Sequence, residues 1–165
     1  LFRNVLIPAV AFIGRFLPDG GLPDARKISP YAMSLLKEYH GEWQFNTEWK
    51  KSMARGERFG WIRAIDKGHD VIHNMDPLPC PVLLMHSHQT ISGNEWTPLY
   101  QQGDAVLNVE HIAHYGKRVS NHVTEVTITD GLHDLVLSRP DVREQVYNEI
   151  YRWLSTLQPT CDENK

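Results

Sequence analysis

Apolar residues recur at helical spacing along the first 75 residues of the chain, where no stretch has the pattern of a strand. A first helix is expected within residues 1–17, ending at the Pro- and Gly-rich segment that follows. Its apolar positions are Val5, Pro8, Ala9, Phe12, Ile13 and Phe16. Ser29 is a suitable cap for a second helix with Pro30 at its first position, and His40-Gly41 should close it. Two further helical segments are expected over residues 46–54 and 57–74.

The pattern changes after Asp76, where three prolines in five positions exclude a helix interior. The continuous apolar run 82–86 follows, as expected of a strand buried on both faces of a parallel sheet. After a long polar loop, Asn108 is a plausible cap for a helix that extends to Val119, and residues 123–129 have the composition of a second strand. A last helix is expected over residues 141–157. This order predicts an α/β fold with a βαβα unit, whose strands are parallel and whose sheet is incomplete without further strands.

Composition excludes several classes of protein. A formal net charge of -3 without a run of Lys or Arg gives no footprint for nucleic acid. Cys80 and Cys161 are the only cysteines, so a disulfide framework is not expected, and a reducing, cytoplasmic compartment fits. Arg3, Asn4 and Arg15 interrupt the apolar opening, which is too short for a stable membrane span. That opening is either an amphipathic helix that covers an apolar surface or an interfacial membrane contact.

The segment 130–135 follows the second predicted strand and contains His133. Loops at the carboxyl ends of parallel strands meet at one crevice, so His133 and Asp104, which follows the first strand, should lie close together. An imidazole becomes an effective base when a carboxylate holds the proton of its other ring nitrogen. His133 and Asp104 are therefore candidates for the base and the acid of a catalytic triad. Alternatively, His133 is an ordinary turn residue, Asp104 caps a helix, or Asp134 is the acid.

Three segments carry a resemblance to a known family. They are residues 80–87 (CPVLLMHS), 104–109 (DAVLNV) and 131–138 (GLHDLVLS), and the closing helix with Trp153-Leu154 matches as well. Together they resemble the α/β-hydrolase fold, and within it the serine aminopeptidase S33 and lysophospholipase or monoacylglycerol lipase group. The resemblance implies a helical cap over residues 1–76, the carboxyl-terminal half of the hydrolase core over 77–158 and a polar tail over 159–165. It also implies the order nucleophile, acid, histidine.

The nucleophile of that family is missing from these residues. No Gly-x-Ser-x-Gly occurs, and the nearest candidate, Ser92, follows the wrong strand and lacks the leading glycine. Position 1 is Leu rather than Met, so the serine and the oxyanion donors are expected upstream. The resemblance implies a serine hydrolase acting on an ester or amide of a lipophilic substrate, with no cofactor and with this portion inactive by itself. Its partner would be the missing amino-terminal half or a second copy. The alternative is a non-catalytic binding or assembly module.

Other histidines and aromatic residues have ordinary interpretations beside the functional ones. His69 and His73 have the spacing of metal ligands, but no third ligand is evident and no metal site is predicted. His111 and His114 are expected on a solvated helix face, and His86 and His88 either line the cleft or pack. The aromatic residues of the first part form either the cap core or an acyl pocket. These are Trp43, Phe45, Trp49, Phe59 and Trp61.

Overall fold

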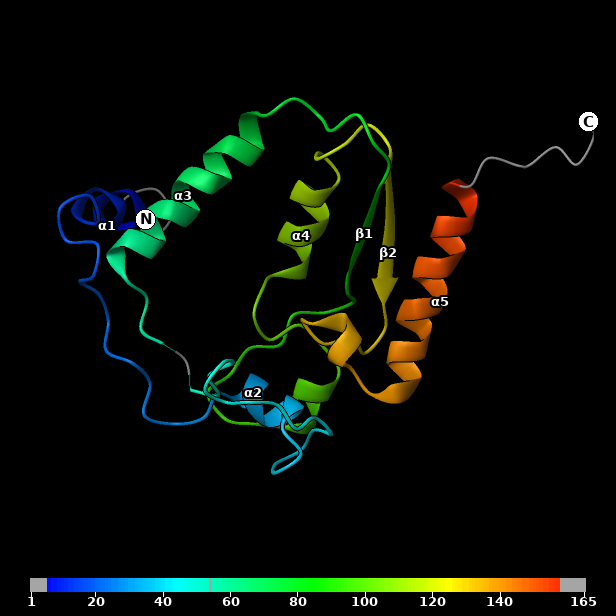
Figure 1. Ribbon diagram of the computed structural model, residues 1–165, viewed down its shortest axis with the longest axis horizontal. Helices are drawn as coiled ribbons and strands as arrows, with labels where there is room; N and C mark the ends of the chain where they lie inside the picture. The colour runs from blue at the N-terminus through cyan, green and yellow to red at the C-terminus, as the bar shows by residue number, and fades with distance from the viewer. Residues whose placement is uncertain (1–5, 54, 158–165) are drawn as a thin grey trace, which may run out of the picture.

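The computed structural model describes residues 6–53 and 55–157 (Figure 1). Val5, Ala54, Cys161 and the predicted tail 159–165 lie outside the described residues. The α-helices are α1 (Ile7–Ile13), α2 (Pro30–Leu35), α3 (Phe59–Asn74), α4 (Val109–Gly116) and α5 (Pro140–Leu157). The strands are β1 (Val82–Ser87) and β2 (Val123–Ile128), and two short 3-10 helices are η2 (Pro98–Gln101) and η3 (Leu135–Leu137). The chain is thus a mixed α/β fold.

The two strands form a parallel pair, as the sequence predicts. The register runs from Val82 opposite Val123 to Ser87 opposite Ile128. Helix α4 connects the strands and packs against β1, whereas α5 packs against β2. In Figure 1, α4 and α5 lie on either side of the strand pair, and both strands run toward the end of the molecule where α2 lies. The carboxyl ends of the strands therefore meet segments from the first part of the chain.

Burial is concentrated at those carboxyl ends. Ile128 is fully buried and packs with Val142 and Val146 of α5, and partly buried Met85 and Val126 extend this cluster. Most of the other strand residues are only partly buried. The expectation that the first strand is buried on both faces is therefore wrong for most of its length. The strands are only partly covered because the sheet has two strands in the described part of the chain, so each has few neighbours.

Side-chain capping explains where α2 and α4 begin. The Ser29 hydroxyl accepts a hydrogen bond from the amide of Ala32 at 3.1 Å, and Pro30 follows as the first residue of α2. The Asn108 side chain accepts from the amide of His111 at 3.0 Å at the start of α4. Both contacts satisfy an amide that has no partner within its helix. The predicted start of each helix is confirmed.

The predicted end of the second helix is wrong. Helix α2 ends at Leu35 rather than at His40-Gly41. The Trp43 amide donates to the Leu35 carbonyl at 2.9 Å, and the Lys37 amide donates to the Trp43 carbonyl at the same distance. Gly41 approaches Leu35 so closely that a Cβ there would lie 2.1 Å from its carbonyl carbon. This returning loop takes hydrogen bonds that another helical turn would need.

No helix forms in the described part of the segment predicted as helical over 46–54. The Asn46 side chain accepts from the amide of Glu48 at 2.8 Å, and the Asn46 carbonyl accepts from the amides of Trp49 and Lys50. Asparagine favours such a local turn because its side chain competes with the helical hydrogen bonds. The chain then extends, and Met53 pairs with Ile28.

Helices α1 and α3 pack against each other at one end of the molecule (Figure 1). Gly14 allows the close approach, because a Cβ there would lie 2.3 Å from the Phe59 carbonyl oxygen. The pair leaves large apolar side chains in solvent, among them Phe12 and Phe16, each 66% exposed. Trp61 is also exposed, and so is Trp49, which places both outside a cap core. Among the described residues, no helix has the length and hydropathy to cross a bilayer.

Candidate active site

The long loop after β1 returns to the end of that strand and delivers Asp104 there. Thr90 pairs with Asp104 in an isolated parallel bridge. The Asp104 amide donates to the Gln89 carbonyl at 2.9 Å, and the Asp104 carbonyl accepts from the Ile91 amide at 2.7 Å. Gly103 is required beside this bridge, since a Cβ there would lie 2.6 Å from Ile91 Cγ1. The loop therefore holds Asp104 next to β1 despite its length.

The Asp104 carboxylate is buried, and both of its oxygens have hydrogen-bond partners. The residue is 2% exposed, and its Oδ1 accepts from the amides of Val106 and Leu107, each at 2.8 Å. Its Oδ2 lies 2.9 Å from His133 Nδ1. Burial by itself would raise the pKa of Asp104, but the hydrogen bonds from His133 and the two amides outweigh it and hold the pKa below its usual value. Asp104 is therefore a carboxylate across the neutral range.

His133 stands in the turn after β2. Asp130 opens this turn in the left-handed region (φ 58°), which Asp tolerates better than most residues. The amide of buried Leu132 donates to the hydroxyl of Ser138 at 2.9 Å, which closes the turn ahead of α5. The imidazole remains 28% exposed. Its hydrogen bond with Asp104 raises the pKa of His133, although burial opposes this shift.

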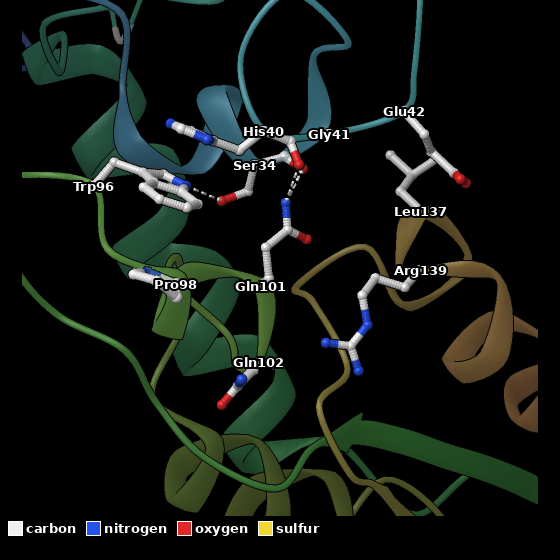
Figure 2. Close-up of a pocket in the computed structure, with 10 residues that line it drawn as sticks. All are labelled: Ser34, His40, Gly41, Glu42, Trp96, Pro98, Gln101, Gln102, Leu137 and Arg139. Carbon is white, nitrogen blue, oxygen red and sulfur yellow. Dashed lines mark hydrogen bonds between the residues drawn. The ribbon is translucent and has the colours of Figure 1, made fainter.

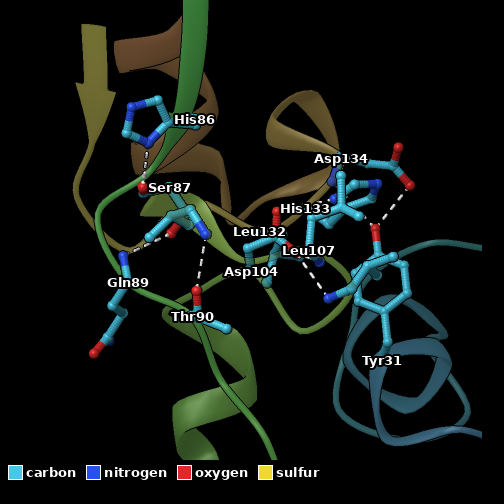
Figure 3. Close-up of polar contacts among 12 residues, drawn as sticks. Tyr31, His86, Ser87, Gln89, Thr90, Asp104, Leu107, Leu132, His133 and Asp134 are labelled. Carbon is cyan, nitrogen blue, oxygen red and sulfur yellow. Dashed lines mark hydrogen bonds and ion pairs between the residues drawn. The ribbon is translucent and has the colours of Figure 1, made fainter. Parts of the chain in front are cut away.

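Asp134, the alternative acid, is held by other partners. Its Oδ2 accepts from the Tyr31 hydroxyl at 2.7 Å and lies 2.8 Å from Lys50 Nζ. Figure 3 shows Asp134 and Tyr31 facing each other on the side of His133 away from Asp104. Burial would raise the pKa of Asp134, but Lys50 and Tyr31 outweigh it and lower the pKa. Of the two acids considered from the sequence, the structure pairs Asp104 with His133.

His86 and His88 make hydrogen bonds near the carboxyl ends of the strands. His86 is buried, with Nδ1 2.7 Å from the Ser87 carbonyl and Nε2 3.2 Å from Glu125 of β2. His88 Nδ1 accepts from the Asp130 amide at 3.1 Å and so supports the turn that carries His133. The packing interpretation therefore fits His86, whereas His88 is exposed and acts through its hydrogen bond to the turn. Ser92 lies exposed in the loop after β1, and no contact joins it to His133 within the described ranges.

Four histidines lie on α3 and α4, and three of them contact Tyr115 of α4. The rings of His69 and His73 stack at 6.0 Å, and His73 stacks on Tyr115 at 4.4 Å. His111 and His114 meet the Tyr115 ring edgewise. Within residues 6–53 and 55–157, no group of three or more His, Cys, Asp or Glu side chains is arranged to hold a metal ion. Of these ring contacts, only that between His73 and Tyr115 joins the two helices, and His111 and His114 are exposed, as predicted for a solvated helix face.

A cavity of about 440 Å³ lies between the loop after α2, η2 and the start of α5 (Figure 2). Gln101 crosses it and donates to the carbonyls of Ser34 and His40, both at 2.8 Å. The lining includes Arg139 but neither Asp104 nor His133. None of the five aromatic residues proposed for an acyl pocket lines it. The cavity is thus separate from the Asp104–His133 pair.

Tyr31 and Lys50 are the neighbours of His133 that sequence reasoning missed. The sequence pattern places Tyr31 only on the apolar face of a predicted helix and Lys50 only in a polar segment. Their partner Asp134 lies 103 and 84 positions away along the chain. No local pattern connects residues at such separations. The sequence gives one hint of this contact. Tyr31 places a hydroxyl on an otherwise apolar helix face, and a buried tyrosine hydroxyl needs a polar partner.

No protein-family model and no curated protein matches this sequence. Among solved structures, the chain is similar to a soluble variant of monoglyceride lipase from Saccharomyces cerevisiae, solved in complex with a substrate analogue. The two are 12% identical, with a TM-score of 0.48. The match covers 95% of this chain and 50% of the lipase chain. This chain therefore spans half of the length of that lipase.

Proposed function

We propose that this chain supplies the acid and the histidine of a Ser-Asp-His triad in a serine hydrolase. The observation that carries the proposal is the 2.9 Å contact between His133 Nδ1 and Asp104 Oδ2. In this role Asp104 holds the Nδ1 proton, so that Nε2 takes the proton of an attacking serine and later gives it to the leaving group. The serine would come from outside these 165 residues, because they contain no Gly-x-Ser-x-Gly.

The charges around the pair support this division of roles. Burial opposes both shifts, but the mutual hydrogen bond, joined at Asp104 by those from two backbone amides, lowers the pKa of Asp104 and raises that of His133. A carboxylate that stays ionised stabilises the imidazolium that forms during attack. The two backbone amides on Asp104 Oδ1 fix the direction of the carboxylate, so that Oδ2 remains available to the imidazole. These features suit a base that must gain and release a proton.

For the substrate we propose an ester, or an amide, with a lipophilic acyl part. The support is the apolar surface of α1, of the turn after it and of α3, where Phe12, Phe16 and Trp61 are more than half exposed. Apolar lining is the usual feature of sites that bind lipophilic ligands. In this proposal residues 1–76 act as a cap that admits the acyl chain. Triad chemistry at Asp104 and His133 requires neither a metal nor an organic cofactor.

We further propose that other strands complete the sheet, from an amino-terminal half of the same protein or from a second copy. Within the described residues β1 and β2 pair only with each other. Each therefore offers an open edge, which is a template for pairing with another strand.

The complete protein, with the upstream region that carries a nucleophile, should hydrolyse p-nitrophenyl butyrate. His133→Ala should reduce kcat/KM by at least about 10³-fold, since loss of the base removes most of the triad's contribution. His111→Ala, which changes an exposed histidine of α4, is the matched control and should leave the rate unchanged. Full activity of the His133→Ala protein would overturn the proposal. Inactivity of an intact, folded wild-type protein on ester and amide substrates would favour the non-catalytic module instead.

A further inference from the structure

We infer that Tyr31, together with Lys50, is a positioning residue for His133 and acts on it through Asp134. This inference rests on the proposed function, in which His133 is the base. Tyr31 belongs to the first turn of α2, and Lys50 ends the turn that begins at Asn46. Both come from the first part of the chain, whereas Asp134 directly follows the base. We call Tyr31, Lys50 and Asp134 the clamp.

The Tyr31 hydroxyl holds Asp134 at two points. It donates to Asp134 Oδ2 at 2.7 Å and accepts from the Asp134 amide at 3.2 Å. That amide belongs to the peptide group that directly follows His133. Both contacts are visible around the Tyr31 hydroxyl in Figure 3. Fixing this peptide restricts the backbone from which the imidazole projects, so the hydroxyl limits how far His133 can move relative to Asp104.

The clamp also prevents Asp134 from competing with Asp104 for His133. Asp134 adjoins His133, and a free carboxylate at this position could pair with the imidazole in place of Asp104. Tyr31 and Lys50 converge on the same Asp134 oxygen, with Lys50 Nζ at 2.8 Å. The ammonium of Lys50 also lies 6.0 Å from the centroid of the Tyr31 ring and 6.0 Å from that of Phe45. Asp134 is thereby neutralised by partners other than His133, and the imidazole keeps Asp104.

The surroundings of Tyr31 keep its hydroxyl protonated and in position. Its ring meets the His133 ring edgewise at 6.1 Å, with 80° between the planes. Burial, reinforced by the hydrogen bond to Asp134, raises the pKa of the Tyr31 phenol well above its usual value. The hydroxyl is therefore protonated throughout the range in which an imidazole titrates. Ser29 anchors the residue by capping α2, so the donor is carried on a defined helical turn.

The test is the protonation state and tautomer of His133 in the complete protein, measured by long-range ¹H–¹⁵N NMR of labelled histidine. The His133 signal is identified by its loss in His133→Gln. In the wild type, neutral His133 should carry its proton on Nδ1, toward Asp104. Tyr31→Phe should shift it toward the Nε2–H form that free imidazole favours and should change the pKa of His133, because the imidazole moves relative to both carboxylates. Tyr39→Phe makes the same change on an exposed tyrosine and should alter neither quantity.

A purely structural role for Tyr31 would lower the midpoint of urea unfolding but leave the tautomer and pKa of His133 unchanged, and that result overturns the inference. If Tyr31→Phe does not fold, Lys50→Met changes a side chain that is 47% exposed and carries the same readout. It should produce a smaller shift toward the Nε2–H form, and an unchanged tautomer would again overturn the inference.

Activity supplies an independent readout in the complete protein. Tyr31→Phe should lower kcat by about 10- to 100-fold with little change in KM, because misplacement of a catalytic group slows chemistry rather than binding. An unchanged kcat contradicts the clamp. The two hypotheses fail differently: if His133 is not a catalytic base, His133→Ala leaves hydrolysis intact, whereas the NMR response of His133 to Tyr31→Phe still appears.

Discussion

Replacing Asp104 by Asn is the sharpest perturbation of the proposed pair. Asparagine has nearly the same shape, and its oxygen can still accept from the amides of Val106 and Leu107, as Oδ1 of Asp104 does. Its NH₂ group would then face His133 Nδ1, where the wild type has a carboxylate oxygen at 2.9 Å. Two donors cannot share this contact, so neutral His133 must change to the Nε2–H tautomer. The loop stays folded while the imidazole loses its orientation and its countercharge.

The magnitude follows from the burial of the two partners. A hydrogen bond between charged groups contributes about 1.5–3 kcal/mol, and the 28% exposure of His133 places this one near the lower limit. We expect Asp104→Asn to lower the free energy of unfolding by about 1.5 kcal/mol where both groups are charged. In the complete protein kcat should fall by about 10⁴-fold, the effect of the same change in a trypsin-like triad, because the tautomer is wrong for base catalysis.

The pH dependence of this loss has a defined sign. The pKa of Asp104 is lowered on folding, so its contribution is present above its unfolded pKa and is lost as pH falls through the folded value. The pKa of His133 is raised, so its contribution is present below its unfolded pKa and is lost as pH rises through the folded value. The stability difference between wild type and Asp104→Asn should therefore be largest between about pH 4 and 6.5, the two unfolded values.

Urea unfolding from pH 3 to 9, followed by tryptophan fluorescence, measures this difference. Asp76→Asn, which changes an exposed carboxylate after α3, is the control and should give a difference near zero at every pH. A stability difference for Asp104→Asn that is independent of pH, together with an unchanged pKa of His133, would show that the two groups do not share a proton-linked contact. That result would refute the reasoning.

Three further predictions concern packing and assembly. Ile128→Ala, at a fully buried site that packs on α5, should lower the free energy of unfolding by about 2–5 kcal/mol. Ile72→Ala, at a site that is 48% exposed, should change it by no more than about 0.5 kcal/mol. Midpoints of urea unfolding measure both. Ser138→Ala removes the buried acceptor of the Leu132 amide and should cost about 1–3 kcal/mol, against almost none for exposed Ser155→Ala in the same assay. Sedimentation velocity of the 165-residue chain should show dimers or larger species, and a compact monomer at micromolar concentration contradicts the proposal that its open strand edges seek a partner.

The strands and the long helices were predictable because their signals are local. The apolar run at 82–86 and the β-branched run at 123–129 gave β1 and β2 to within one residue, and the caps Ser29 and Asn108 gave the starts of α2 and α4. The proximity of His133 and Asp104 followed from one topological rule about the carboxyl ends of parallel strands. That rule needs only the order of the elements along the chain.

The features that failed or were missed depend on contacts between distant residues. Helix α2 ends early because Trp43 takes the Leu35 carbonyl, a choice that helical spacing does not reveal. The exposure of Trp49 and Trp61 reflects how little of the described chain covers them, whereas composition alone suggested a core. The clamp joins residues that are 103 and 84 positions apart in the sequence. The boundaries at residues 76 and 158 stay predictions.

The most direct test of the central claim is labelling of the complete protein by a fluorophosphonate, followed by intact mass. This reagent reacts with a serine only when a base activates it, so the test does not require knowledge of the substrate. We predict one adduct on the wild type, on a serine outside these 165 residues, and labelling slower by at least about 10³-fold in His133→Ala. Equal rates of labelling in the two proteins would contradict the assignment of His133 and Asp104 to a catalytic triad.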